Sequence, residues 1–184
     1  MTIPFRDAAE LEAGGNAAFL RITGGDRRRA AALLQVNGRG EPIEFTFNHL
    51  DLPSGPLWRP HDLAHWVARE LTASLLQAAQ RSPLVLLCLA REVPPGLFRD
   101  DLLVQLPVCR VATRDEMAGL DRGEVAEERR VTDETVHLFW RPAPAPPESP
   151  PRRLLESLVT RGLVLEPFER VLAGIHEALA DQGS

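Results

Sequence analysis

The chain has 184 residues, of which 44% are hydrophobic and 26% charged, and its formal net charge at pH 7 is −5. These values are ordinary for a globular domain and argue against a disordered, fibrous or membrane-spanning protein. The acidic balance also disfavours a chain dedicated to the phosphate backbone of nucleic acid. The apolar run 84–90 is far shorter than the ~20 residues of a spanning helix, and the N-terminus lacks a secretory pattern. We therefore expect one cytoplasmic domain.

The two cysteines, Cys88 and Cys109, both lie in apolar stretches. Such thiols usually act as small buried hydrophobic groups in a reducing compartment, so we expect both to be free. A disulfide between them would require their two strands to be neighbours.

Three strands are predicted early in the chain, at residues 17–23, 30–36 and 42–48. Asn37-Gly38 is a strong signal for a tight hairpin between the second and the third. The third strand alternates, with Ile43, Phe45 and Phe47 on one side. We expect an antiparallel meander with one buried face, preceded in residues 1–15 by a short helix or a loose arm.

The next segments predict a crossover connection. Residues 60–81 begin with Pro60, which suits the first helical position, and carry an apolar residue every three or four positions. The run 84–90 is apolar on both faces, as in a central strand covered on both sides. Strand, helix and buried strand form a crossover, so this strand should be parallel to the first. A short helix at 94–103, a strand at 107–112 and a charged surface segment at 113–134 follow.

A last strand at 135–140 and two helices, at 151–161 and 167–181, complete the predicted elements. The fold class is therefore α/β, with α+β as the alternative, and the mixed sheet should contain five to six strands. We assign residues 1–141 to this core and 142–151 to a proline-rich connector. Residues 152–184 form a helical pair packed on the same domain.

The segment His61-Asp62-Leu63-Ala64-His65 contains the one metal-binding motif that the sequence offers. Two histidines four residues apart share a helix face, which is the spacing of the zincin motif with Asp in place of Glu. His61, Asp62 and His65 are thus candidate metal ligands, with Glu92 as the nearest strand-end carboxylate. The helical phase places both histidines opposite the apolar stripe, so a solvated face is the favoured interpretation and no cofactor is expected.

Clustered arginines and an isolated tryptophan are the candidate binding residues. Arg27, Arg28 and Arg29 lie at the first hairpin, and Arg39 lies at the second. Together they could contact phosphates or an acidic partner, although hairpins at opposite ends of a meander would separate them. Trp58, followed by Arg59, has the composition of an interface hot spot, whereas packing against the helix is the simpler interpretation.

The element order over residues 17–112 resembles that of RNase H-like nucleases. The resemblance implies a carboxylate in the middle of the first strand, with partners on the fourth strand and nearby helices, that together bind two divalent metal ions. Here the first strand has no acid and only Arg21 is charged, while Glu92 follows the buried strand. Residues 37–47 and 163–171 also resemble segments of bacterial proteins without an assigned activity.

The absence of a catalytic motif favours a non-catalytic binding or assembly subunit of a bacterial multiprotein system, with a protein partner rather than nucleic acid or a membrane. One alternative is a metal-dependent hydrolase that uses the histidine motif or carboxylates such as Asp51, Glu92 and Asp100. Another is a degenerate RNase H-like domain that binds nucleic acid through residues 27–29. A further open question is whether the polar groups Glu44, Asp51, His61 and Glu92 converge into a pocket.

Overall fold

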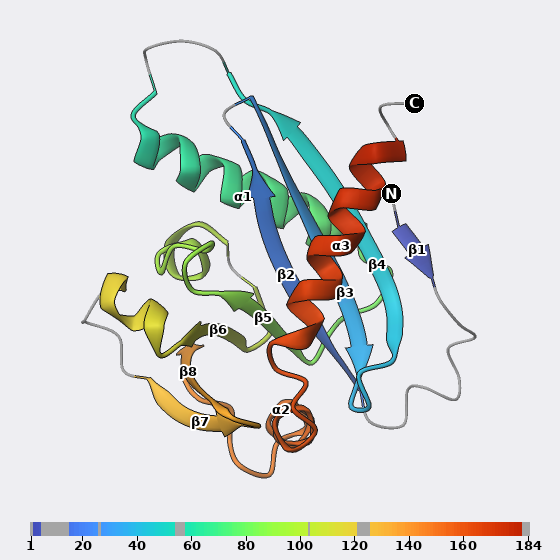
Figure 1. Cartoon of the computed structure of the whole chain (residues 1–184), viewed down its shortest axis with the longest axis vertical. Helices are drawn as coiled ribbons and strands as arrows, with labels where there is room; N and C mark the ends of the chain where they lie inside the picture. Colours follow the sequence, from blue (N-terminus) through green and yellow to red (C-terminus); the bar gives the residue numbers. More distant parts are fainter. Residues whose placement is uncertain are drawn as a thin grey trace.

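The computed structural model describes residues 2–4, 15–25, 27–53, 58–102, 104–120 and 126–181. In this part of the chain, eight strands form one sheet in the order β1-β4-β3-β2-β5-β6-β8-β7 (Figure 1). The strands are β1 (Thr2–Pro4), β2 (Asn16–Gly24), β3 (Arg28–Asn37), β4 (Pro42–Asp51), β5 (Val85–Leu89), β6 (Val108–Thr113), β7 (Glu127–Val131) and β8 (Glu134–Arg141). The helices are α1 (Pro60–Ala78), α2 (Pro150–Thr160) and α3 (Glu166–Asp181), with a π-helical turn η3 (Leu97–Asp101) and a 3-10 turn η4 (Asp115–Gly119).

The predicted α/β fold with a mixed sheet is confirmed. Strands β2, β3 and β4 form the antiparallel meander, α1 makes the crossover, and β5 lies parallel to β2. Strand β6 continues the parallel pairing next to β5, whereas β8 and β7 return antiparallel. The sheet thus has more strands than expected, because β7 lies in the segment predicted to be only charged surface and β1 is a strand of three residues. The remainder of the arm at 1–15, apart from Gly15, lies outside the described residues.

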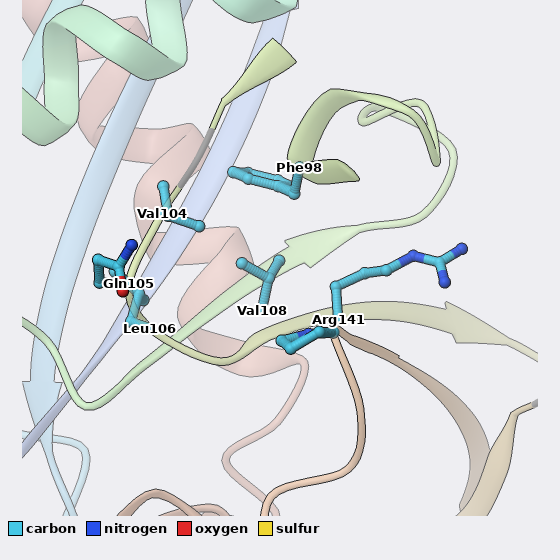
Figure 2. A pocket seen from close by; sticks show the side chains of 7 residues that line it. Phe98, Val104, Gln105, Leu106, Val108 and Arg141 are labelled. Carbon is cyan, nitrogen blue, oxygen red and sulfur yellow. The ribbon is translucent and has the colours of Figure 1, made fainter. Parts of the chain in front are cut away.

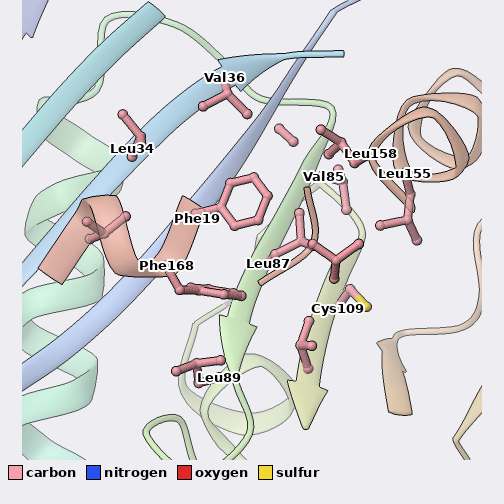
Figure 3. Packing of buried hydrophobic residues seen from close by; sticks show 14 of the residues in the cluster. Phe19, Leu34, Val36, Val85, Leu87, Leu89, Cys109, Leu155, Leu158 and Phe168 are labelled. Carbon is pink, nitrogen blue, oxygen red and sulfur yellow. The ribbon is translucent and has the colours of Figure 1, made fainter. Parts of the chain in front are cut away.

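Helices cover both faces of the sheet. In Figure 1, α3 crosses in front of β2, β3 and β4, and α1 lies behind them. The face toward α2 and α3 holds the larger hydrophobic cluster (Figure 3), in which the Phe19 and Phe168 rings meet edge to face at 5.1 Å. The opposite face packs Leu20, Leu33 and Leu86 against α1 and η3. Side chains of both C-terminal helices therefore pack against the face of the sheet that holds the larger cluster.

The expectation of one buried face for the meander is wrong. Phe45 and Phe47 pack under α3, but Glu44 and Thr46 on the other face are also buried, each with 1% of its surface exposed. The Glu44 carboxylate accepts hydrogen bonds from Thr46 Oγ1 at 3.1 Å and from the backbone N–H of Gln80 at 2.9 Å. Because these partners replace water, a polar strand face can lie under the C-terminal end of α1.

Helix α1 follows the predicted apolar phase, with Val67, Leu71 and Leu75 buried. Leu63 and Trp66 lie at the margin of the same cluster and are only partly buried. None of the helices described has the length and apolar character needed to cross a membrane.

Candidate functional site

Arg21 on β2 and Glu92, three residues beyond β5, form an ion pair at the carboxyl edge of the sheet. Since β2 and β5 are parallel, their carboxyl ends meet at the same edge. Arg21 Nε lies 2.8 Å and 3.0 Å from the two carboxylate oxygens of Glu92, and Arg21 Nη2 lies 2.8 Å from Oε1. The side chains are only 9% and 12% exposed, respectively. The contact is a partly buried, bidentate pair.

The remaining polar atoms of this pair bond the backbone. The N–H of Ile22 donates to Glu92 Oε2 at 3.0 Å, and Arg21 Nη1 donates to the carbonyl of Phe168 at 3.3 Å. The pair thereby joins β2, the loop after β5 and the first turn of α3. Burial raises the pKa of Glu92 above its ordinary value, and the Ile22 N–H and the Arg21 guanidinium oppose this rise without cancelling it.

The residues at this edge do not fit the two divalent metal ions that an RNase H-like element order implies. Strand β2 contains no acid, and Arg21 is its one charged residue. Both oxygens of Glu92 are engaged, and a guanidinium beside them repels a cation. Across the described chain, no group of three or more His, Cys, Asp or Glu side chains is placed to hold a metal. Two-metal chemistry needs a cluster of hard oxygen ligands.

Two side chains of the histidine motif contact each other, since His61 Nδ1 lies 3.7 Å from Asp62 Oδ1, whereas His65 contacts η3. The His61 side chain is 88% exposed, and Asp62 Oδ2 accepts from Arg59 Nε at 2.6 Å. This hydrogen bond lowers the pKa of the Asp62 carboxyl. His65 Nε2 lies 2.6 Å from Asp101 Oδ2 and so connects α1 to η3. The two imidazole rings stack with centroids 6.4 Å apart, but no third ligand accompanies them among the described residues.

The carboxylate and imidazole groups that could have converged into a pocket do not form one cluster. Glu44 bonds the backbone at the end of α1, whereas Glu92 bonds Arg21 at the other end of the sheet. Asp51 pairs with Arg28, and His61 lies on the surface of α1. The side chain of Asp100 lies outside the described residues.

The structure brings together three of the four candidate arginines. Arg27, Arg28 and Arg29 lie around the hairpin between β2 and β3, whose turn begins at Gly24 with a φ of +128° that favours glycine. Arg28 Nε donates to Asp51 Oδ1 at 2.6 Å, and Arg29 Nη1 donates to the carbonyl of Gly24 at 3.1 Å. Arg39 lies at the opposite end of the meander, in the hairpin next to α2, where Ser157 bonds the Gly38 carbonyl.

Trp58 lies near the hairpin between β2 and β3, just before the start of α1. It is 39% exposed and is the one large hydrophobic side chain that the described surface exposes. Its ring centroid lies 5.4 Å from that of Trp66, with 39° between the planes. A pocket of about 270 Å³ lies here, lined by Arg29, Leu52, Trp58, Pro60, Leu63, Ala64 and Val67. The sequence did not predict that Arg29 and Trp58 share a pocket, because the contact depends on how β3 and α1 pack.

A second pocket, of about 420 Å³, lies at the amino end of β6 (Figure 2). Its walls are Phe98, Val104, Gln105, Leu106, Val108, Arg141 and Pro142. The lining is mainly apolar, with Arg141 at the end of β8 as its charged member. None of these residues was singled out from the sequence, because short apolar segments are also typical of core.

Comparisons with known proteins bear on the fold. No family model and no curated protein matches the chain. Endonuclease V from Streptomyces avermitilis superimposes with a TM-score of 0.63 at 13% identity, over 92% of this chain and 83% of that one. Endonuclease V from Bacillus subtilis gives a TM-score of 0.58 at 11% identity, over 92% of this chain and 82% of that one. A protein of unknown function from Archaeoglobus fulgidus gives a TM-score of 0.52 at 13% identity, over 89% of this chain and 98% of that one.

At these identities the likeness is one of fold. The comparisons do not support the resemblance of residues 37–47 and 163–171 to segments of bacterial proteins without an assigned activity. The chain therefore shares its fold with endonucleases V, and this likeness supports the RNase H-like resemblance of its element order.

Proposed function

We propose that this chain is a nucleic-acid-binding domain of RNase H-like fold that does not hydrolyse nucleic acid. The observation that carries the proposal is the Arg21–Glu92 pair at the carboxyl edge of a sheet shared with endonucleases V. Ligands of open α/β sheets bind at this edge, and here it presents a guanidinium and an engaged carboxylate instead of free acids. Binding without cleavage is the function that this combination supports best.

The basic hairpin supports the same proposal. Residues 27–29 concentrate three guanidinium groups next to the carboxyl end of β2, on a chain whose net charge is −5. Asp51 neutralises only Arg28. Arginine forks match phosphate oxygens in geometry as well as in charge, so a local basic surface can bind a phosphate backbone despite the acidic total.

Salt-dependent binding tests this proposal. Labelled single-stranded and double-stranded oligonucleotides are titrated with the protein at several salt concentrations, using fluorescence anisotropy. The parent should bind with a steep salt dependence. A variant with Arg27, Arg28 and Arg29 changed to Ala should bind more weakly, with a slope smaller by about 2 if all three arginines contact phosphates of a single strand.

A matched control comes from the opposite end of the molecule. Arg39, Arg153 and Arg161 are exposed and lie near the second hairpin and α2. Changing these three to Ala alters the net charge by the same amount as the test variant does. Because they lie away from the proposed binding surface, affinity should fall much less. Equal losses in the two triple variants, or a parent that binds no oligonucleotide, would contradict the proposal. Magnesium- or manganese-dependent cleavage that Glu92→Gln abolishes would contradict the non-catalytic part.

A non-catalytic assembly subunit, as the sequence suggested, is the second proposal. The exposed Trp58 next to Arg59 favours it, because such pairs are enriched at protein interfaces. Co-elution with the product of a neighbouring gene, lost on Trp58→Ala, would support this function.

A further inference from the structure

We propose that the pocket beside Trp58 binds one unpaired base of a single-stranded nucleic acid, with the base stacked on the indole ring. This inference rests on the proposed function and narrows it to a strand whose bases are accessible. The argument depends on how Trp58 is held, on the shape of the pocket, and on the charges around it.

Trp58 offers a supported aromatic surface. The residue is 39% exposed, and its ring centroid lies 5.4 Å from that of Trp66 on α1. The residues that follow it restrict the backbone, since Arg59 is the N-cap of α1 and Pro60 is its first residue. A ring held in this way loses little conformational freedom when a second planar group stacks on it.

The pocket suits a planar apolar group. Leu52, Leu63 and Val67 contribute aliphatic walls, and the volume is about 270 Å³. Small-molecule sites typically begin at about 300 Å³, so a base fits this pocket better than a whole nucleotide does. The sugar and phosphate would then remain outside, at the rim.

The rim is where the arginines lie. Arg29 lines the pocket itself, and Arg27 is exposed next to it in the hairpin. Asp51 and Asp62 bind Arg28 and Arg59, respectively, whereas Arg29 bonds the Gly24 carbonyl and keeps its positive charge for a phosphate, together with Arg27. An aromatic platform next to guanidinium groups is the arrangement that single-strand binders use, because every base has a face that stacks. In a duplex the faces of paired bases are already covered, so the pocket selects unpaired ones.

An oligothymidylate and an abasic oligonucleotide of the same length separate the contribution of base stacking from that of phosphate binding. Both carry the same phosphates, but only the first has bases to stack. The parent should bind the oligothymidylate about 5- to 150-fold more tightly than the abasic strand, as expected for one stacked base. Trp58→Ala should lower affinity for the oligothymidylate to that for the abasic strand, and Trp58→Phe should retain part of the difference. The Arg27/Arg28/Arg29 triple variant should weaken binding of both strands alike.

The outcomes distinguish this inference from the proposed function. Equal affinity of the parent for the two strands, or tighter binding of a duplex, would overturn base stacking and leave nucleic-acid binding intact. Binding of neither strand would overturn the proposed function itself. A Trp58→Ala variant that binds both strands as the parent does would overturn the inference. Thermal unfolding followed by circular dichroism establishes that each variant is folded, and Trp58→Phe keeps the test available if Trp58→Ala unfolds.

Discussion

Arg21 and Glu92 hold one positive and one negative charge largely out of water, so each depends on the other. Removing one partner of a buried pair leaves an uncompensated charge, which typically costs about 3–5 kcal/mol. We expect Arg21→Met to lower the free energy of unfolding by about this amount, and Arg21→Met/Glu92→Met to recover most of it. Urea denaturation of the two single variants and the double variant measures the coupling. Additive effects of the two single changes would contradict the pairing.

The raised pKa of Glu92 has a consequence for stability against pH. Since its pKa is higher in the folded state than in the unfolded chain, the folded state takes up a proton first as the pH falls. The stability that the Glu92 carboxyl contributes therefore increases as the pH falls from 7 toward 4.5, the ordinary pKa of this group, and is constant at lower pH. The difference in unfolding free energy between the parent and Glu92→Gln should increase between pH 7 and 5. A difference that shrinks over this range would show that the pKa of Glu92 is lowered instead.

The two cysteines lie on neighbouring strands but on opposite faces of the sheet. Cys88 is paired in register with Arg110 and faces α1, whereas Cys109 is paired with Leu87 and faces the α2 side. Neither cysteine forms a disulfide and both are buried, and burial raises the pKa of Cys109 well above its ordinary value. We expect neither thiol to react with a thiol-specific reagent until the protein unfolds, when both should react. Rapid labelling of the native protein would contradict this placement.

At the scale of elements, the Glu44 carboxylate fastens the end of α1 to β4. It accepts a hydrogen bond from the backbone N–H of Gln80, the residue after the C-cap Ala79. Glu44→Ala leaves this N–H and the Thr46 hydroxyl without their partner in a buried place, which costs about 1–3 kcal/mol. Thermal unfolding should show a clear loss of stability for Glu44→Ala and a much smaller one for Glu177→Ala, an exposed carboxylate on α3. Equal losses would contradict an anchoring role for Glu44.

The elements that the sequence predicted correctly are those with a local signal. Asn37-Gly38 indicates the second hairpin, the apolar period indicates α1, and a continuous apolar run indicates β5. Strand β7 lacks such a signal because its sequence Glu127–Val131 is mostly charged, and its formation depends on pairing with β8. The burial of Glu44 likewise depends on where α1 ends.

The candidate sites follow the same division. The sequence shows that β2 lacks an acid and that Glu92 follows β5, because both are local facts. The bond between Arg21 and Glu92 joins residues 71 positions apart and forms only when β2 and β5 pair. The pocket shared by Arg29 and Trp58 also joins distant segments. Residue types thus show which acids a strand lacks more readily than which contacts form between distant segments.

At the scale of the whole molecule, we expect the sheet to depend on α2 and α3 for its stability. These helices contribute Leu155, Leu158, Phe168 and Val171 to the cluster that covers one face of the sheet. A chain ending at residue 141 would expose that face, so it should lack cooperative unfolding and should bind a hydrophobic dye. Calorimetry and dye fluorescence, compared with the full chain, test this. A truncated chain with a sharp transition would show that the sheet is stable alone.

The two outermost strands of the sheet also bear on self-association. An exposed edge offers unpaired backbone groups to another chain, and short or charged edge strands discourage such additions. Strand β1 has three residues, and β7 carries Glu127, Glu128, Arg129 and Arg130 in succession. The described sheet therefore ends in strands that are poor templates for strand addition, so we expect little aggregation by this route.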